Sequence, residues 1–133
     1  MTFPHAGALD RAAQHRCEVF QQAGPFLSPQ QTASVLGLSE TGLEHLRARS
    51  VIIGVPIDDA WRYPAIQFQD AKPLHRLQDV LAAHYNIAEW VILDSLMAVD
   101  PAFGNRSIIN LLEEKDDLSI DRVVSLLREQ YAP

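Results

Sequence analysis

Residues 27–39 read LSPQQTASVLGLS, and they carry the clearest structural signal in the chain. Ser28 can accept a hydrogen bond from the backbone N–H of Gln31, and Gln31 can reach back to the backbone of Ser28. Pro29 falls at the first helical position, where no N–H is needed. The sequence therefore predicts a helix that starts at Ser28 and runs to about Leu36.

A second short helix is predicted directly afterwards. Gly37 suits the tight turn because glycine tolerates a left-handed backbone, and Ser39 can cap a helix that runs to about Ala48. Leu43 and Leu46 fall on the inward face of that helix. Two short helices joined by a glycine turn, with a polar cap on the second, predict a helix-turn-helix.

A β-hairpin is predicted after the helix pair. Residues 51–55 (VIIGV) are mostly β-branched and indicate a strand, and Asp58 and Asp59 indicate a turn. Residues 61–64 (WRYP) are expected to form the return strand. Pro64 restricts that strand to an edge, or itself to the strand's end, because proline donates no hydrogen bond.

Helical periodicity dominates the remaining chain, with apolar residues at three- and four-residue steps. The predicted helices cover residues 8–23, 73–86, 87–99, 106–114 and 119–130. We expect Asn105 and Ser119 to cap the last two helices and residues 115–117 to form an exposed loop. The expected core residues of the C-terminal helices are Leu74, Leu77, Val80, Leu81, Trp90, Leu93, Leu96, Met97, Val123, Val124, Leu126 and Leu127.

These elements predict a mainly α fold in three parts. Residues 1–25 form an N-terminal helix or arm, residues 26–70 a winged helix-turn-helix with a short β-hairpin, and residues 71–133 a small helical C-terminal domain. One face of the first helix, either the seam of a homodimer or a cap on the protein's own core, consists of Leu9, Ala13, Cys17 and Phe20.

The composition fits one globular domain or two small ones that share a core, with 133 residues, 47% hydrophobic residues and one cysteine. A single cysteine excludes a disulfide framework. No run approaches ~18 apolar residues, so we expect no membrane span. Charges throughout the N-terminal region argue against a signal peptide, and we expect a cytoplasmic protein.

The net charge of −6 is unevenly distributed. Residues 1–68 carry five basic and six acidic side chains (−1), whereas residues 69–133 carry six basic and eleven acidic ones (−5). Indiscriminate coating of nucleic acid needs clustered Lys and Arg, so the composition excludes it. The acidic C-terminal half is either a solvated surface or a face that docks a basic partner.

The sequence lacks the usual motifs of enzymes and metal sites. No two of the five histidines have the i, i+4 spacing of a helical metal site, and no Walker loop, G-x-S-x-G or G-x-G-x-x-G occurs. Cys17 falls on an apolar stripe, which favours a small buried residue over a nucleophile. We therefore expect no enzyme, no metal and no cofactor.

Residues 27–39 resemble the opening of the excisionase/MerR-like winged helix-turn-helix domains, which typically read L-s-x-x-x-A-A-x-x-L-G-v-S. In this interpretation Ala33 is small where the two helices cross, and Val35 and Leu36 pack into the core. Residues 61–68 resemble the wing of that family as it returns to the domain.

This resemblance implies that the second helix enters the major groove of DNA and that the wing touches phosphates. The residues expected near base edges are Ser39, Glu40, Thr41, Glu44 and His45. Those expected near the DNA backbone are Arg47, Arg49 and Arg62.

Four acidic residues leave an alternative open. Glu40 and Glu44 lie on the expected DNA-reading helix, and Asp58 and Asp59 lie at the expected wing tip, where they oppose the phosphate field. A glutamate can still accept a hydrogen bond from cytosine N4. The chain is therefore either a DNA-binding protein or a protein-interaction adaptor whose helix-turn-helix no longer binds DNA.

Residues 99–112 (VDPAFGNRSIINLL) resemble the toxin-binding domain of MbcA/ParS/Xre-type antitoxins, which often reads p-N-p-a-L-g-G-r-s-P-l-e-l-L. The resemblance covers roughly residues 74–130 and implies a toxin of the RES or a related NAD-consuming type as partner. The alternative for most of these residues is plain helical packing. The predicted partner-binding residues are Phe103, Asn105, Arg106 and Arg128.

Together these observations predict a DNA-binding, antitoxin-like transcriptional regulator. We expect it to bind the operator of its own gene as a homodimer and to hold a toxin protein through its C-terminal half, since pairing two weak DNA sites raises their combined affinity.

Overall fold

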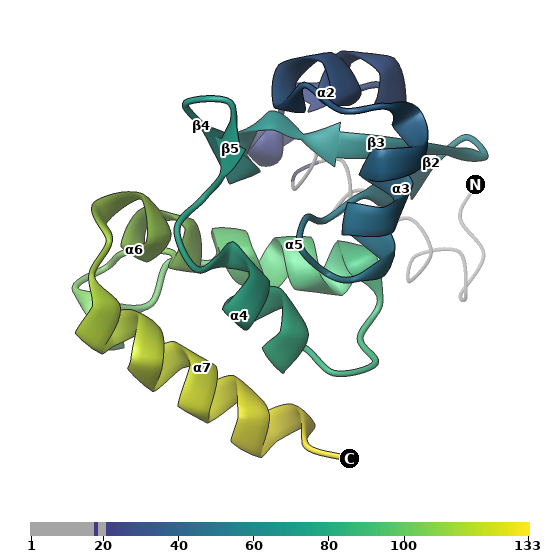
Figure 1. The fold of residues 1–133 in the computed structure, drawn as a ribbon. Helices are drawn as coiled ribbons and strands as arrows, with labels where there is room; N and C mark the ends of the chain where they lie inside the picture. The colour runs from purple at the N-terminus through teal and green to yellow at the C-terminus, as the bar shows by residue number, and fades with distance from the viewer. Residues whose placement is uncertain (1–17, 19–20) are drawn as a thin grey trace, which may run out of the picture.

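The computed structural model describes Glu18 and residues 21–133 of the chain (Figure 1). The predicted first helix over residues 8–23 falls mostly outside this part. Glu18 and residues 21–23 are helical. The residues of the expected dimer seam lie outside the described residues: Leu9, Ala13, Cys17 and Phe20.

Helix α2 (Pro29–Leu36) begins as predicted. The Ser28 hydroxyl accepts a hydrogen bond from the Gln31 N–H at 3.1 Å, and the Gln31 side chain accepts one from the Ser28 N–H at 2.9 Å. Gly37 ends the helix with φ = 68°, in the left-handed region. The reciprocal cap and the glycine stop set the length of α2 locally.

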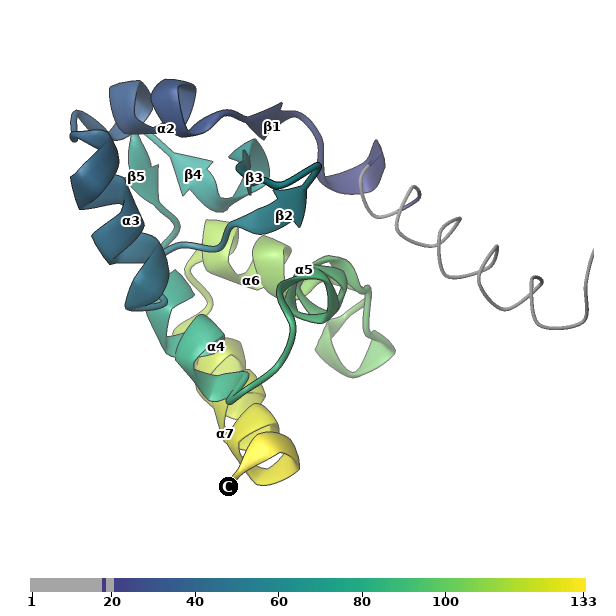
Figure 2. The same ribbon diagram turned by 90° about the vertical axis from the view of Figure 1, so that its right-hand side faces the viewer.

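Helix α3 (Glu40–Ala48) follows, and the Ser39 hydroxyl caps it by accepting from the Gly42 N–H at 3.1 Å. Leu43 is fully buried and Leu46 is half-buried. The predicted helix-turn-helix is therefore confirmed at both caps and at its inward face. Figure 2 shows α3 along the outer edge of the upper half of the molecule, beside α2.

A three-stranded antiparallel sheet lies next to the helix pair, with strand order β1-β3-β2. Its strands are β1 (Phe26–Leu27), β2 (Val55–Ile57) and β3 (Ala60–Pro64). Asp58 and Asp59 form the predicted turn, both with positive φ. Pro64 ends the central strand, where it pairs with Phe26, in agreement with the restriction that proline imposes.

The strand predicted over residues 51–55 is wrong for most of its length, because β2 begins only at Val55. The backbone N–H and C=O of Ile53 are instead bound by the side chain of Gln67, each at 2.8 Å. Gln67 belongs to the short 3-10 helix η1 (Ala65–Gln67). A small hairpin that the sequence did not predict, β4 (Phe68–Gln69) with β5 (Lys72–Pro73), follows it.

Helices make up the C-terminal half, as predicted. Figure 1 shows them below the sheet, with α7 forming the lower edge of the molecule. The elements are α4 (Leu77–Ala83), α5 (Glu89–Met97), the 3-10 helix η2 (Pro101–Phe103), α6 (Ile108–Glu114) and α7 (Asp117–Tyr131).

Two predicted caps are wrong by a few residues. Asn105 lies in the turn with φ = 58°, and Ser107 caps α6 in a reciprocal pair with Asn110. Asp116, not Ser119, caps α7: its carboxylate accepts from both the N–H and the hydroxyl of Ser119. Aspartate is as good an N-cap as serine, so α7 starts earlier and the predicted loop over residues 115–117 is shorter.

The core consists of two hydrophobic clusters. The smaller one joins α2, α3 and the wing through Ala33, Leu43, Ile52 and Tyr63. The larger one, which lies among α4–α7, confirms most of the predicted helical core and also contains Ala23, Ile53 and Val55. The predictions for Val35 and Leu126 are wrong, since they are 41% and 49% exposed and face away from their neighbouring helices.

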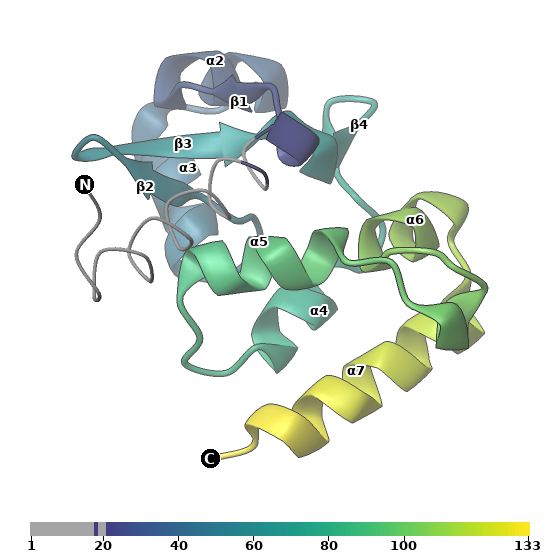
Figure 3. The ribbon, with the colours of Figure 1, turned by 180° about the vertical axis from the view of Figure 1, so that it is seen from behind.

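Helix α5 connects the two halves. Figure 3 shows it directly below β2, and the indole N–H of Trp90 donates to the backbone C=O of Pro56 at 3.3 Å. The rings of Phe26 and Trp90 lie 6.2 Å apart. Among the described residues, no helix has the length and apolar character needed to cross a membrane.

Candidate nucleic-acid interface

The outer face of α3 carries most of the side chains predicted to read bases. Thr41, Glu44 and His45 are all exposed. Their spacing of three and four residues places them on one stripe of the helix, opposite the buried Leu43. Ser39 is exposed at the start of the same helix, where its hydroxyl is engaged as the cap. Helix α3 therefore presents a short polar stripe to solvent.

Two arginines are available beside this stripe. Arg49 is exposed and follows the last turn of α3. Arg62 is half-buried on β3, and its guanidinium donates to the backbone C=O of Trp61 at 3.4 Å. They occupy the end of the second helix and the wing strand, the two places that the resemblance assigns to phosphate contacts.

Arg47 has a different environment from the other predicted DNA-binding residues. Its guanidinium lies over the ring of Trp61, 3.9 Å from the ring centroid, and its Nε is buried with no hydrogen-bond partner. Burial raises the pKa of the nearby Tyr63 hydroxyl, while Arg47 acts in the opposite direction. Arg47 therefore joins α3 to the wing by a cation–π contact.

Gly54 leaves the space in which this contact forms. A Cβ atom at Gly54 would lie 3.0 Å from Cδ of Arg47, 3.0 Å from a ring carbon of Tyr63 and 3.3 Å from a ring carbon of Trp61. Sequence reasoning missed Trp61 as the partner of Arg47, because a contact between residues fourteen positions apart has no local signal.

The acidic residues remain on the candidate interface. Glu40 and Glu44 are exposed on α3, and Asp58 and Asp59 are exposed at the tip of the β2–β3 hairpin. Each of these charges opposes the approach of a phosphate backbone. The interface therefore combines an arrangement suited to DNA with a charge pattern that weakens it.

The four predicted partner-binding residues separate into two groups. Phe103 is buried, with 9% of its surface exposed, and the Arg122 guanidinium lies 5.6 Å from its ring centroid. Asn105 and Arg128 are exposed. Phe103 thus contributes to the core, while Asn105 and Arg128 are accessible to a partner.

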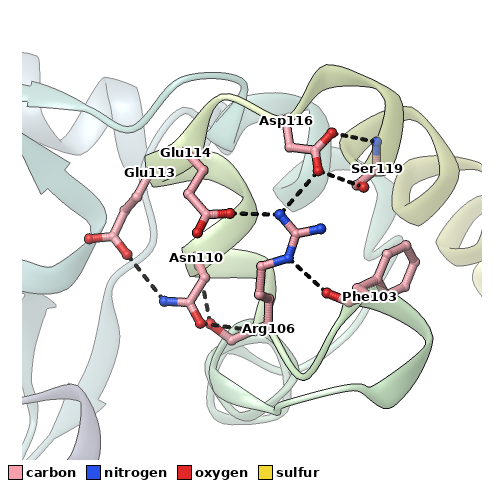
Figure 4. Close-up of polar contacts among 8 residues, drawn as sticks. Phe103, Arg106, Asn110, Glu113, Glu114, Asp116 and Ser119 are labelled. Carbon is pink, nitrogen blue, oxygen red and sulfur yellow. Dashed lines mark hydrogen bonds and ion pairs between the residues drawn. The ribbon is translucent and has the colours of Figure 1, made fainter.

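Arg106 is the centre of a polar network that connects η2, α6 and α7 (Figure 4). Its Nε donates to the C=O of Phe103 at 2.8 Å, and its Nη1 contacts Glu114 at 2.7 Å and Asp116 at 3.1 Å. The hydrogen bond to Glu114 contributes most to raising the pKa of Arg106. The side chain holds three chain segments together, a role that the sequence did not reveal.

The described residues contain no group of three or more His, Cys, Asp and Glu side chains that could hold a metal ion. The buried His84 is already bonded on both ring nitrogens, to the C=O of Val80 and to the hydroxyl of Ser95, each at 2.9 Å.

The helix pair, the hairpin and the outer stripe of α3 define a mainly helical protein of the winged helix-turn-helix class. Comparison with solved structures finds the NMR structure of Rv2175c, with a TM-score of 0.66 and 15% sequence identity, covering 80% of this chain and 81% of that one. At this identity the likeness shows a shared fold. No protein-family model matches the chain, and neither does any curated protein sequence.

Proposed function

We propose that this protein binds DNA and regulates transcription, with α3 in the major groove and the β2–β3 hairpin against the backbone. The observation that carries the proposal is the exposed stripe Thr41–Glu44–His45 on a second helix held by caps and a buried leucine. A helix presented in this way matches the width of the major groove. The operator of its own gene is the first DNA to test.

The proposed contacts differ in kind. Thr41, Glu44 and His45 reach base edges and determine sequence preference, whereas Arg49 and Arg62 contact phosphates and contribute affinity. Two such cations per molecule give weak binding. We therefore propose that two copies bind together as a homodimer, so that the second contact is made at a high effective concentration.

A salt titration of the full-length protein tests these roles. Fluorescence anisotropy would follow binding to labelled fragments of its own promoter between about 50 and 200 mM salt. We expect the double variant Arg49→Ala, Arg62→Ala to weaken binding to all fragments alike. The slope of log K against log salt should become shallower by about 2, one unit for each lost phosphate contact.

Arg128→Ala provides the matched control, because it removes one exposed positive charge from α7, at the opposite end of the molecule (Figure 1). It should leave DNA affinity and the salt slope unchanged. Absence of binding to every fragment of the locus at low salt would overturn the proposal, as would an equal effect of the control and the double variant.

The alternative function is a protein-interaction adaptor, and the exposed acids Glu40, Glu44, Asp58 and Asp59 favour it. An adaptor would use the same α3 surface to bind a basic protein instead of DNA. The titration distinguishes the two functions, since an adaptor shows no DNA binding even at low salt.

A toxin as the partner of the C-terminal half also remains a proposal, and with it an activity that is not enzymatic. It rests on the exposed Asn105 and Arg128, because Phe103 and Arg106 are engaged within the fold. A neighbouring gene for a toxic enzyme and a partner that co-purifies from the native host are the observations that test it.

A further inference from the structure

A cavity of about 410 Å³ lies where the end of α3, the segment before β2 and the α4–α5 connection meet. A cavity of this size falls in the range used for small ligands. Its lining combines the charged side chains of Arg47 and Glu89 with apolar ones such as Ile53 and Ile92. Neither the proposed DNA contacts nor the proposed partner contacts use this space.

Arg47 supplies a fixed positive charge to the cavity. The cation–π contact with Trp61 orients its guanidinium, and no ion pair or hydrogen bond joins it to any other described residue. A guanidinium held in one plane recognises a carboxylate through two parallel hydrogen bonds. The unpaired Arg47 is therefore suited to an anionic group on a ligand.

Glu89 supplies the opposite charge. It is half-buried in the first turn of α5, and no hydrogen bond or ion pair joins it to another residue in the described part of the chain. A carboxylate with no partner in a partly enclosed site favours an ammonium group or another strong donor. The nearby His84 does not compete for a ligand, because both of its ring nitrogens are already bonded.

The apolar lining adds a third requirement. Ile53, Leu81, Ile87 and Ile92 contribute hydrocarbon surface to the same cavity. Apolar surface favours a ligand with an aliphatic or aromatic group.

We propose that the cavity binds a small zwitterion with an apolar side chain, of the class of the large apolar amino acids. Its carboxylate would pair with Arg47, its ammonium group with Glu89, and its side chain would pack on the isoleucines. This inference is independent of DNA binding, since the ligand would bind the free protein.

Nuclear magnetic resonance of the ¹⁵N-labelled full-length protein tests the assignment with L-leucine, L-methionine and L-phenylalanine as probes. We expect at least one of them to shift the indole N–H of Trp61 in a saturable manner at millimolar concentration. 3-Phenylpropionate, which lacks the ammonium group, and 2-phenylethylamine, which lacks the carboxylate, should bind at least tenfold more weakly than the amino acid.

Charge-neutral variants separate the two contacts. Arg47→Gln and Glu89→Gln should each weaken binding about tenfold or more, which corresponds to one lost charge-assisted contact. Lys72→Gln removes an exposed charge from β5 and should bind as the unaltered protein does. Should Arg47→Gln fail to fold, Glu89→Gln alone decides, because this position lies in the first turn of α5 and outside the core clusters.

Three outcomes would overturn the proposal. One is the absence of a saturable shift with all three amino acids. Another is equal binding of L-phenylalanine and 3-phenylpropionate, which would show that Glu89 recognises nothing. The third is unchanged affinity in both cavity variants.

Discussion

The buried side chain of Gln67 takes the place of a neighbouring strand for Ile53. Its amide oxygen accepts from the Ile53 N–H, and its amide nitrogen donates to the C=O of Ile53 at 2.8 Å and to that of Pro64 at 3.1 Å. Gln67 has no exposed surface. One side chain thus satisfies three backbone groups at the point where the helix-turn-helix meets the helical half.

Replacing Gln67 with leucine should lower the free energy of unfolding by roughly 2–4 kcal/mol, since a buried N–H and two carbonyls lose their partner. Urea denaturation followed by circular dichroism measures the change. The neighbouring exposed Gln69→Leu is the control, and it should stay within about 0.5 kcal/mol of the original protein. A loss of similar size in both variants would contradict this role for Gln67.

At the scale of elements, the parts that could be predicted from the sequence are those with local causes. The starts of α2 and α3 follow from Ser28 and Ser39, because a cap bonds to a backbone group three residues away. The turn at Asp58 and Asp59 is local as well.

Long-range contacts could not be predicted in the same way. The pairing of β1 with β3, the bonds from Gln67 to Ile53 and the position of Arg47 on Trp61 all depend on tertiary packing. For the candidate interface, periodicity was sufficient to place the exposed stripe of α3. It could not distinguish Arg47 from Arg49, which the structure turns to different environments.

The junction of η2, α6 and α7 depends on Arg106, which contacts Phe103 through Nε and both Glu114 and Asp116 through Nη1. Arg106→Ala should lower the thermal midpoint and speed amide hydrogen exchange at the start of α7, near Ser119. Arg106→Lys should recover part of this loss, because it keeps the charge but not the two-directional geometry.

The exchange of amides in α3 serves as an internal reference for this variant, since that helix belongs to the other hydrophobic cluster. Faster exchange confined to the α6–α7 junction is the expected pattern. Unaltered exchange at Ser119 would show that the network contributes nothing to the order of this junction.

At the scale of the whole molecule, the predicted boundary near residue 70 is crossed by a continuous core. Ile53 and Val55, from the segment before the wing and from β2, belong to the same cluster as the C-terminal helices. Trp90 adds a hydrogen bond to Pro56 and a ring contact to Phe26. A change that loosens the helical half is therefore expected to affect the position of the wing.

His84 makes this coupling sensitive to pH. The buried ring lies on α4's C-terminal side, bonds to Ser95 of α5 at 2.9 Å, and contacts the ring of Tyr131 of α7 at 5.7 Å. Burial lowers the pKa of His84 below its ordinary value of 6.5. In the folded protein the ring therefore stays neutral at a pH at which the unfolded chain already binds a proton.

The sign of the effect follows from this difference. Below a pH of about 6.5 the unfolded state takes up more protons than the folded state, so stability falls as the pH falls, until the folded-state pKa is reached. The slope contributed by one histidine is at most about 1.4 kcal/mol per pH unit. Asp116 and Asp117 have lowered pKa values, so their contributions are lost only at more acidic pH.

Urea denaturation at a series of pH values between 5 and 7 measures this slope. His84→Gln should flatten it, because glutamine keeps hydrogen-bonding groups near Val80 and Ser95 but does not titrate in this range. His45→Gln changes an exposed histidine and should retain the original slope. If His84→Gln and the original protein lose stability equally between pH 6.5 and 5, the pH dependence arises from groups other than His84, and the neutral ring is not what links α4, α5 and α7.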